Sequence, residues 1–243
     1  MSVTVVSTYY KIPSKQPHSF YQEHLRRWFR AISVPVIFFT TPDVQCEIED
    51  FGFPLEHVQF IHLPFDELVA WSKWGRAFWE QQCSIDVEKY HTPELAALWY
   101  EKKEFVKRAM KLSAADVFIW CDAGCARDDA SEYAMRMFGK RSVSIPAGKL
   151  LMQKINYIPK KEFYTFPNKC IAGAIQAGNR DAWMNHMIAY DDTMVRYIDA
   201  GICCNMDQYV LLSSSNIFPH IYELIKPPSN LSINVWFFML QTL

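Results

Sequence analysis

The sequence predicts an α/β domain with a mixed, mostly parallel sheet flanked by helices. Apolar strand-like runs alternate with helix-like segments in the first half of the chain, as in the units that build parallel sheets. Residues 117–120 are four bulky apolar residues without polar alternation, which is typical of a strand covered on both faces. A chain of 243 residues is also long enough to bury a sizeable core.

Three strands are predicted in the N-terminal quarter of the chain. The apolar runs 3–10, 34–41 and 58–63 each end at a polar or proline-containing stretch. Between the first two, apolar residues at a spacing of three and four predict an amphipathic helix that begins at Ser19, with this serine as its cap. We therefore expect the three strands to leave the sheet on the same side.

Two helices are predicted before the central strand, over residues 64–82 and from Pro93 onward. Their tryptophans either stack on a base or sugar or, as is more frequent at helical spacing, pack in the core. These tryptophans are Trp71, Trp74, Trp79 and Trp99. One turn after the last of them, Lys102 and Lys103 either reach an anionic ligand or are solvated.

The second half of the chain continues the alternation and shows no repeat or low-complexity linker, so we expect one domain over residues 1–243. The apolar segment 233–240 is too short to span a bilayer and reads as a final strand or a packing segment. The other elements expected here are helices over 129–138, 180–200 and from Asp207, an apolar segment over 149–155 and a strand over 170–175.

Composition excludes several classes of protein. A formal net charge of -1 lacks the excess of positive charge expected of a nucleic-acid-binding protein. The seven cysteines lack paired Cys-x-x-Cys spacing and read as reduced thiols; Cys121 and Cys125 form a weak zinc signal against the alternative of buried packing. Neither a signal peptide nor a transmembrane run is recognisable, so we expect the cytoplasm, or the host cytoplasm if the protein is viral.

An acidic residue ends the central predicted strand. Asp122 follows the apolar run and precedes the small residues Ala123 and Gly124, which leave room for a ligand near the backbone. Ligands of such sheets bind beyond the carboxyl ends of the strands, so Asp122 stands where chemistry is expected. The alternative is that Asp122 caps a turn or the next helix.

Four motifs resemble, in chain order, the HtrL/YibB-like family, which is similar to GT-A glycosyltransferases. They are Val-Val-Ser-Thr-Tyr-Tyr at 5–10, the helix over 92–103, Phe-Ile-Trp-Cys-Asp-Ala-Gly at 118–124 and Asp207-Gln208. The resemblance implies a nucleotide-sugar-binding half over 1–125 and an acceptor-side half over 126–243. It also implies transfer of a hexosyl or N-acetylhexosaminyl group from a nucleotide diphosphate sugar, UDP-linked by analogy, to a hydroxyl of a glycan or glycoconjugate.

The resemblance further implies a divalent cation, Mn²⁺ or Mg²⁺, at the diphosphate. Asp122 corresponds to the first acid of the Asp-x-Asp motif of GT-A enzymes, whereas Gly124 stands in place of the second acid. A hard cation with oxygen ligands suits carboxylate and phosphate together. The candidates to help hold the metal are Asp128, Asp129 and His220, and the candidates to replace it as cationic clamps are Lys103 and Arg127.

The remaining site residues are also carried over from the family. The end of the first strand is expected to seat the nucleoside, with a tyrosine ring stacked on the base, and Gly173 is expected to border the acceptor. Asp207, with Gln208, is the candidate for acceptor activation or sugar orientation, the alternative being a carboxylate at a helix N-terminus. The residues expected to contact the donor are Thr8, Tyr9, Tyr10, Trp120, Asp122, Ala123 and Gly124.

Two other functions remain open at this stage. Replacement of the second acid by Gly124 is compatible with a GT-A-like nucleotide- or glycan-binding scaffold that has lost turnover. A sugar nucleotidyltransferase is disfavoured, because no glycine-rich loop with a basic residue follows Tyr10 to hold a triphosphate.

Overall fold

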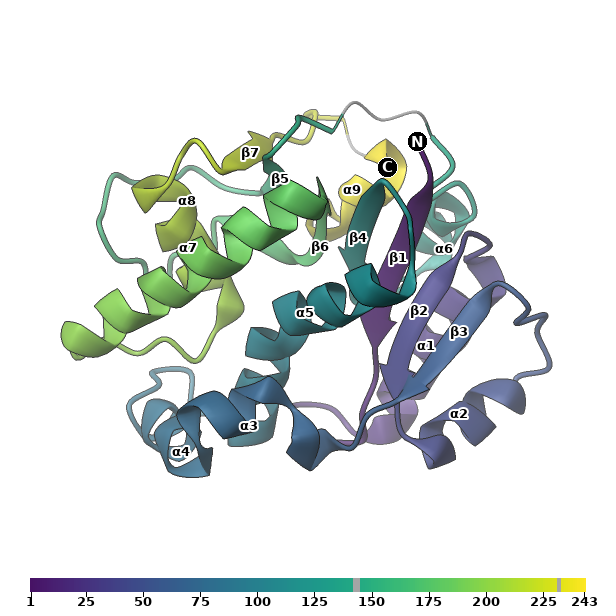
Figure 1. Cartoon of the computed structure of the whole chain (residues 1–243), viewed down its shortest axis with the longest axis horizontal. Helices are drawn as coiled ribbons and strands as arrows, with labels where there is room; N and C mark the ends of the chain where they lie inside the picture. Colours follow the sequence, from purple (N-terminus) through teal and green to yellow (C-terminus); the bar gives the residue numbers. More distant parts are fainter. Residues whose placement is uncertain (142–144, 231–232) are drawn as a thin grey trace.

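A seven-stranded sheet forms the centre of the computed structural model, which describes residues 1–141, 145–230 and 233–243 (Figure 1). The strand order is β3-β2-β1-β4-β6-β5-β7. Only β6 runs antiparallel to its neighbours, so the predicted mixed, mostly parallel sheet is confirmed. The strands are β1 (Val3–Thr8), β2 (Val36–Thr40), β3 (Val58–His62), β4 (Val117–Cys121), β5 (Leu150–Lys154), β6 (Ile171–Asn179) and β7 (Tyr222–Ile225).

Helices cover both faces of this sheet, with α5 and α7 in front of the strands in Figure 1. Alternate residues of one strand belong to the two cores: Val6 packs with α5 and α7, whereas Val5 packs with α1 and α6. The helices are α1 (His18–Ala31), α2 (Pro42–Glu49), η1 (Phe65–Glu67), α3 (Val69–Trp74), α4 (Arg76–Ser84), α5 (Pro93–Leu112), α6 (Asp129–Met135), α7 (Arg180–Asp199), α8 (Asp207–Ile217), η2 (Val235–Phe237) and α9 (Met239–Thr242).

Side-chain caps fix the starts of α5 and α6. The Thr92 hydroxyl accepts a hydrogen bond from the Leu95 amide at 3.2 Å, and Pro93 supplies the first helical position of α5. Asp128 caps α6 in the same way by accepting from the Ser131 amide at 2.7 Å. The predicted cap of α1 is wrong: α1 begins at His18, after Pro17, and no side chain in the described ranges caps it.

Two segments differ from the sequence prediction for local reasons. The single helix predicted over 64–82 is divided, because Gly75 has φ of 79°, a left-handed conformation that ends α3 before α4 begins. The segment 233–240 packs as η2 and α9 and forms no strand; Asn234 caps η2 by accepting from the Trp236 amide at 3.0 Å. Buried Gln153 of β5 holds this segment by accepting from the Met239 amide at 3.1 Å and donating to the Val235 carbonyl.

None of the helices in the described ranges is long and apolar enough to cross a membrane.

Candidate active site

A cavity of about 710 Å³ lies at the carboxyl ends of β1 and β4. Its walls come from the loop after β1, from α1 and α5, from the turn after β4 and from η2. Sites for small molecules in proteins typically have volumes of about 300–1,000 Å³, so the cavity can hold a ligand of nucleotide size. Eight of the predicted site residues line it together: Thr8, Tyr9, Tyr10, Trp120, Asp122, Ala123, Gly124 and Arg127.

Asp122 reaches this cavity from a rigid support. Its backbone amide donates to the Ala174 carbonyl at 2.8 Å, which extends the pairing of β4 with β6 by one residue. The indole nitrogen of Trp120 donates to Oδ1 of Asp122 at 2.7 Å and fixes the carboxylate. The side chain is 36% exposed, so the carboxylate remains partly accessible from the cavity, although its Oδ2 also lies 3.4 Å from the Lys102 ammonium.

Lys102 of α5 connects Asp122 to the start of α8. Its ammonium nitrogen lies 3.1 Å from Oδ1 of Asp122, 2.8 Å from Oδ2 of Asp207 and 3.0 Å from the Gly173 carbonyl oxygen. Oδ2 of Asp122 also lies 3.4 Å away, so the ammonium faces the oxygens of three groups, which match its three donors. Burial alone would lower the pKa of Lys102, but the charges of Asp122 and Asp207 outweigh it and raise this pKa above its ordinary value. Lys102 is therefore a charged, internally paired group.

Gly173 makes this arrangement possible. A Cβ atom at residue 173 would lie 2.8 Å from Oδ2 of Asp207, which is closer than carbon and oxygen can approach. Asp207 is buried and does not line the cavity, and the Gln208 amide nitrogen donates to the Ile171 carbonyl at 2.8 Å. These contacts make Asp207 and Gln208 anchors of α8 on β6 in this structure.

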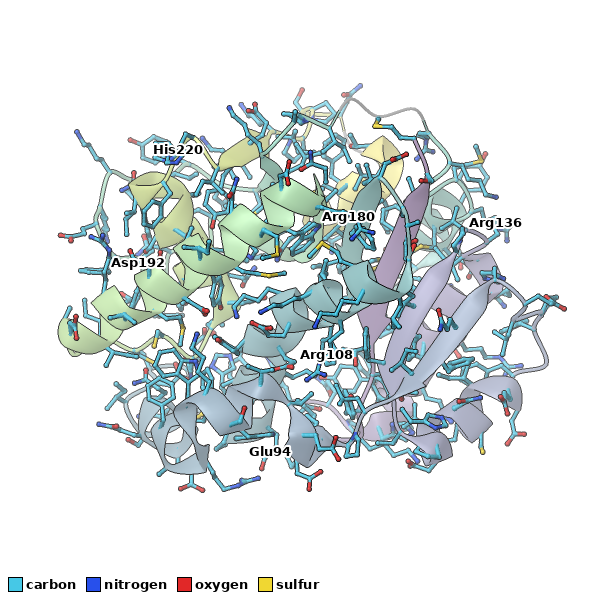
Figure 2. All side chains as sticks on the ribbon, in the orientation of Figure 1. Glu94, Arg108, Arg136, Arg180, Asp192 and His220 are labelled. Atoms are coloured by element: carbon cyan, nitrogen blue, oxygen red, sulfur yellow. The ribbon has the colours of Figure 1, made fainter. Side chains whose placement is uncertain are left out.

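Two predicted site residues lie elsewhere. Lys103 is buried outside the cavity lining, with its nitrogen 2.8 Å from Glu104 and 3.2 Å from Asp191, so it is not placed to clamp a diphosphate in this cavity. His220 follows α8 and precedes β7 in the chain, and it is exposed at the amino edge of the sheet (Figure 2). Asp122 lies at the carboxyl edge, roughly 20 Å away along the strand direction alone, so the two cannot hold one ion.

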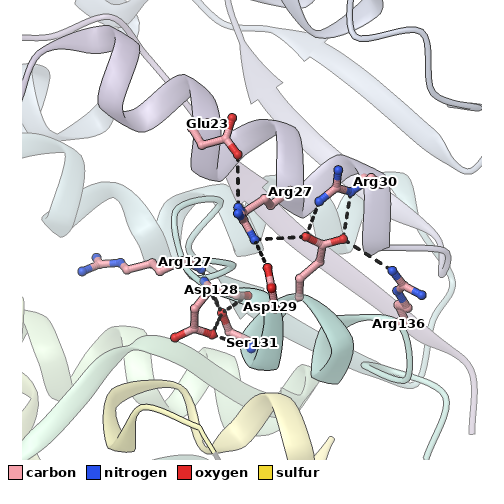
Figure 3. Close-up of polar contacts among 9 residues, drawn as sticks. Glu23, Arg27, Arg30, Arg127, Asp128, Asp129, Ser131 and Arg136 are labelled. Carbon is pink, nitrogen blue, oxygen red and sulfur yellow. Dashed lines mark hydrogen bonds and ion pairs between the residues drawn. The ribbon is translucent and has the colours of Figure 1, made fainter.

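The side chains around Asp122 do not form a set of metal ligands that fits a resident divalent cation. Within residues 1–141, 145–230 and 233–243, no group of three or more His, Cys, Asp or Glu side chains is arranged to hold a metal. The Asp128 carboxylate caps α6, and Asp129 pairs with Arg27 at 2.7 Å (Figure 3). The oxygens nearest to Asp122 already surround the ammonium of Lys102.

An ion-pair cluster between α1 and α6 anchors the turn that carries Asp122. Glu132 of α6 accepts from Arg30 and contacts Arg27 and Arg136, as Figure 3 shows. Arg127 extends away from this cluster in the same view. Its Nε donates to the Gly124 carbonyl at 3.0 Å, and its guanidinium lies 5.0 Å from the Phe237 ring centre, so it is held at the cavity wall.

Tyr9 presents its ring to the cavity through a fixed hydrogen-bond chain. Its hydroxyl is 2.6 Å from Nδ1 of His18, whose Nε2 is 2.9 Å from Glu47. Burial, followed by the charge of Glu47, raises the pKa of Tyr9 to about 12, so the phenol stays protonated. Tyr10 is buried more deeply and donates to the Leu63 carbonyl at 2.8 Å, which leaves Tyr9 as the more accessible ring.

Cations outnumber carboxylates on the cavity wall. The described lining holds four cations and one carboxylate, Asp122, which gives a formal charge of +3 when His18 is not counted. Lys11 is neutralised by Asp43, at 2.9 Å, and by Glu47. The four cations are Lys11, Lys15, Lys102 and Arg127. Within the described part of the chain Lys15 and Arg127 form no ion pair, so these two remain available to an anionic ligand.

Sequence reasoning did not select Lys102 over Lys103, and it missed Phe237. The helical spacing of Leu95, Trp99 and Lys102 places all three on one face of α5, and all three line the cavity. That spacing was the available signal for Lys102. Trp79, in contrast, is buried in the core, as the packing alternative predicted. Phe237 reaches the cavity through the packing of η2, for which the sequence offers no local signal.

Comparison with known proteins identifies the fold. No protein-family model and no curated protein sequence matches the chain. Mouse xyloside xylosyltransferase 1, in its apo form, has a similar structure with a TM-score of 0.54 at 7% sequence identity, over 93% of this chain and 85% of that one. The fold is GT-A-like. The GT-A-like architecture predicted from the sequence is therefore confirmed, while membership of the HtrL/YibB-like family stays a prediction.

Two further structures have lower TM-scores. A glycosyltransferase involved in the glycosylation of the major capsid of PBCV-1 has a TM-score of 0.46 at 12% identity, over 93% of this chain and 83% of that one. A CMP:2-keto-3-deoxy-manno-octonic acid synthetase complexed with CTP has a TM-score of 0.41 at 12% identity, over 93% of this chain and 90% of that one.

Proposed function

We propose that the protein is a glycosyltransferase that moves a sugar from a nucleotide diphosphate sugar to a hydroxyl group of a glycan or glycoconjugate. The observation that carries the proposal is the composition of the cavity at the carboxyl ends of β1 and β4. It combines aromatic rings, unpaired cations and one accessible carboxylate in a space of about 710 Å³. These groups match a base, a diphosphate and a sugar, respectively. A UDP-linked hexose or N-acetylhexosamine is the donor we propose.

Each part of the donor has a complementary group in the cavity. The ring of Tyr9, held by His18, offers a stacking surface for the base. Arg127 and Lys15, which form no ion pair with the described residues, are the cations for the diphosphate. The carboxylate of Asp122, which is 36% exposed, is the acceptor for a sugar hydroxyl, while Trp120 donates to its Oδ1. We propose that Asp207 and Gln208 position this arrangement from α8 without contacting the donor.

The transfer breaks the bond between the anomeric carbon and the diphosphate oxygen, and the electron pair leaves with the nucleotide diphosphate. The acceptor oxygen forms the new bond to the anomeric carbon. Its proton passes to a base, for which a diphosphate oxygen and Asp122 are the candidates within the cavity. The cations at the cavity wall stabilise the negative charge that develops on the leaving diphosphate. We place this reaction in the cytoplasm, which suits the seven free thiols of the chain.

Isothermal titration with UDP, UDP-glucose and UDP-N-acetylglucosamine tests the proposal. We expect binding of UDP and of at least one sugar nucleotide. Asp122→Asn should weaken the sugar nucleotide by about tenfold or more, because a hydrogen bond to a charged group is lost, while UDP stays within about twofold. Asp129→Asn is the matched control, since its side chain is 98% exposed in the same segment and lies outside the cavity.

Absence of binding by the wild-type protein would overturn the proposal. Equal weakening by Asp129→Asn and Asp122→Asn would overturn the role given to Asp122.

A second function is favoured by one specific observation. Asp207 is buried against Lys102, so the described cavity lining offers Asp122 as its single carboxylate. A GT-A-like scaffold that binds a nucleotide sugar without transferring it needs no further base. It differs from the first function in one outcome, which is binding without release of UDP.

A further inference from the structure

We infer that the ammonium of Lys102 is the built-in cation of this site and occupies the position that a divalent metal ion would otherwise take. The consequence for the proposed function is that nucleotide-sugar binding and transfer need no added metal. Only this consequence rests on the proposed function. Three oxygens from three separate segments converge on one nitrogen: the Asp122 carboxylate after β4, the Asp207 carboxylate of α8 and the Gly173 carbonyl of β6.

The oxygens are arranged as in a cation site, and the cation that fills it is the ammonium group of a side chain. The distances from the nitrogen to the three oxygens are 3.1, 2.8 and 3.0 Å. Carboxylate and carbonyl oxygens are the ligands that hard divalent cations prefer, at about 2.0–2.6 Å. The oxygens would need to move inward by about 0.5 Å to reach calcium-like distances and by about 0.7–1.0 Å to reach magnesium-like distances. The same three groups would therefore make a divalent cation site if the ammonium were absent.

The site also restricts which residues the chain can carry next to it. Gly173 lets the Asp207 carboxylate lie against the β6 backbone, where any Cβ would be 2.8 Å from Oδ2. Trp120 holds Oδ1 of Asp122 on the other side at 2.7 Å. Because Lys102 uses all three donors internally, it does not contact the donor diphosphate directly. Its charge offsets the repulsion between the carboxylates of Asp122 and Asp207. Arg127 and Lys15 are the cations that remain to bind the phosphates.

Replacement of Lys102 distinguishes this arrangement from an ordinary salt bridge. Lys102→Met removes the charge and leaves two carboxylates and one carbonyl around its former position. We expect this variant to bind Mn²⁺ at least about tenfold more tightly than the wild type, because two uncompensated carboxylates attract a divalent ion. The measurement is a titration of Mn²⁺ alone, followed by electron paramagnetic resonance, with no nucleotide present. Thermal unfolding of Lys102→Met should shift to higher temperature when Mn²⁺ is added.

Lys103→Met is the matched control. It removes a buried lysine from the next position of the same helix, between Glu104 and Asp191. Lys73 remains 2.6 Å from Asp191 and Lys107 remains 3.7 Å from Glu104, so those carboxylates keep a cationic partner. We expect Lys103→Met to bind Mn²⁺ no more tightly than the wild type.

Two results would overturn the inference. One is tight Mn²⁺ binding by the wild-type protein, which can be measured even if Lys102→Met does not fold. The other is a folded Lys102→Met variant with no gain in Mn²⁺ affinity. Both are read without UDP, so they are distinguishable from failure of the proposed function, which appears as absence of nucleotide binding with or without Mn²⁺.

Discussion

The substitution Gly173→Ala tests the packing on which the site depends. The new methyl group would lie 2.8 Å from Oδ2, 3.2 Å from Cγ and 3.3 Å from Oδ1 of Asp207. Residue 173 is a buried residue near the start of β6 and its backbone belongs to the strand, so we expect the Asp207 side chain to be the part that moves. Overpacking in a buried site costs about 1–3 kcal/mol. Displacement of Asp207 also breaks its contact with Lys102, so we expect the upper half of this range.

The assay is urea unfolding of Gly173→Ala and of the control Gly124→Ala, for which no atom of the described residues lies within 4 Å of the added Cβ. The control should change the free energy of unfolding by less than about 0.5 kcal/mol. A double-mutant cycle with Asp207→Ala identifies the cause, because shortening Asp207 removes the clash. The cost of Gly173→Ala should fall by more than about 0.5 kcal/mol in that background. Additive costs would refute the packing argument.

Two other predictions concern buried and exposed charges. Burial raises the pKa of Glu101 from 4.5 to about 7, although the Val69 and Ala70 amides donate to it. Its contribution to the free energy of unfolding is therefore present below pH 4.5 and is lost as the pH rises through 7, by about 3 kcal/mol in total. Urea unfolding of Glu101→Gln should lack this pH dependence. An unchanged dependence would contradict the raised pKa of Glu101. Arg127→Ala should weaken UDP binding by about tenfold in low salt and by less in high salt. An unchanged dissociation constant, or equal weakening by Arg136→Ala outside the cavity, would argue against contact of Arg127 with the diphosphate.

The sequence was sufficient for the elements whose hydrophobic pattern is long and regular. The parallel strands β1, β2, β3 and β4 and the helices α5 and α7 follow their predicted ranges to within a few residues. The four-residue strand β7 was not predicted, because a run of this length carries too little alternation to be recognised. The break at Gly75 was missed because apolar spacing continues across it.

The site was partly accessible for the same reason. Asp122, Tyr9 and Arg127 follow strand ends, and parallel strands bring their carboxyl ends to one edge of the sheet. Which of two adjacent lysines faces the cavity depends on the rotation of α5, and adjacent residues of a helix point about 100° apart. Only the folded chain separates Lys102, at the site, from Lys103, at Asp191. The packing of Phe237 from the C-terminal segment likewise depends on tertiary contacts alone.

Release of UDP from sugar nucleotides tests the central claim most directly. The wild-type protein is incubated with UDP-glucose, UDP-galactose and UDP-N-acetylglucosamine in the presence of EDTA, with candidate glycan acceptors, beside Asp122→Asn and Asp129→Asn. We predict release from at least one donor by the wild type and by Asp129→Asn, and a loss of release in Asp122→Asn. Binding of a sugar nucleotide with no release of UDP by the wild type, with or without Mn²⁺, would contradict transfer and favour a binding protein.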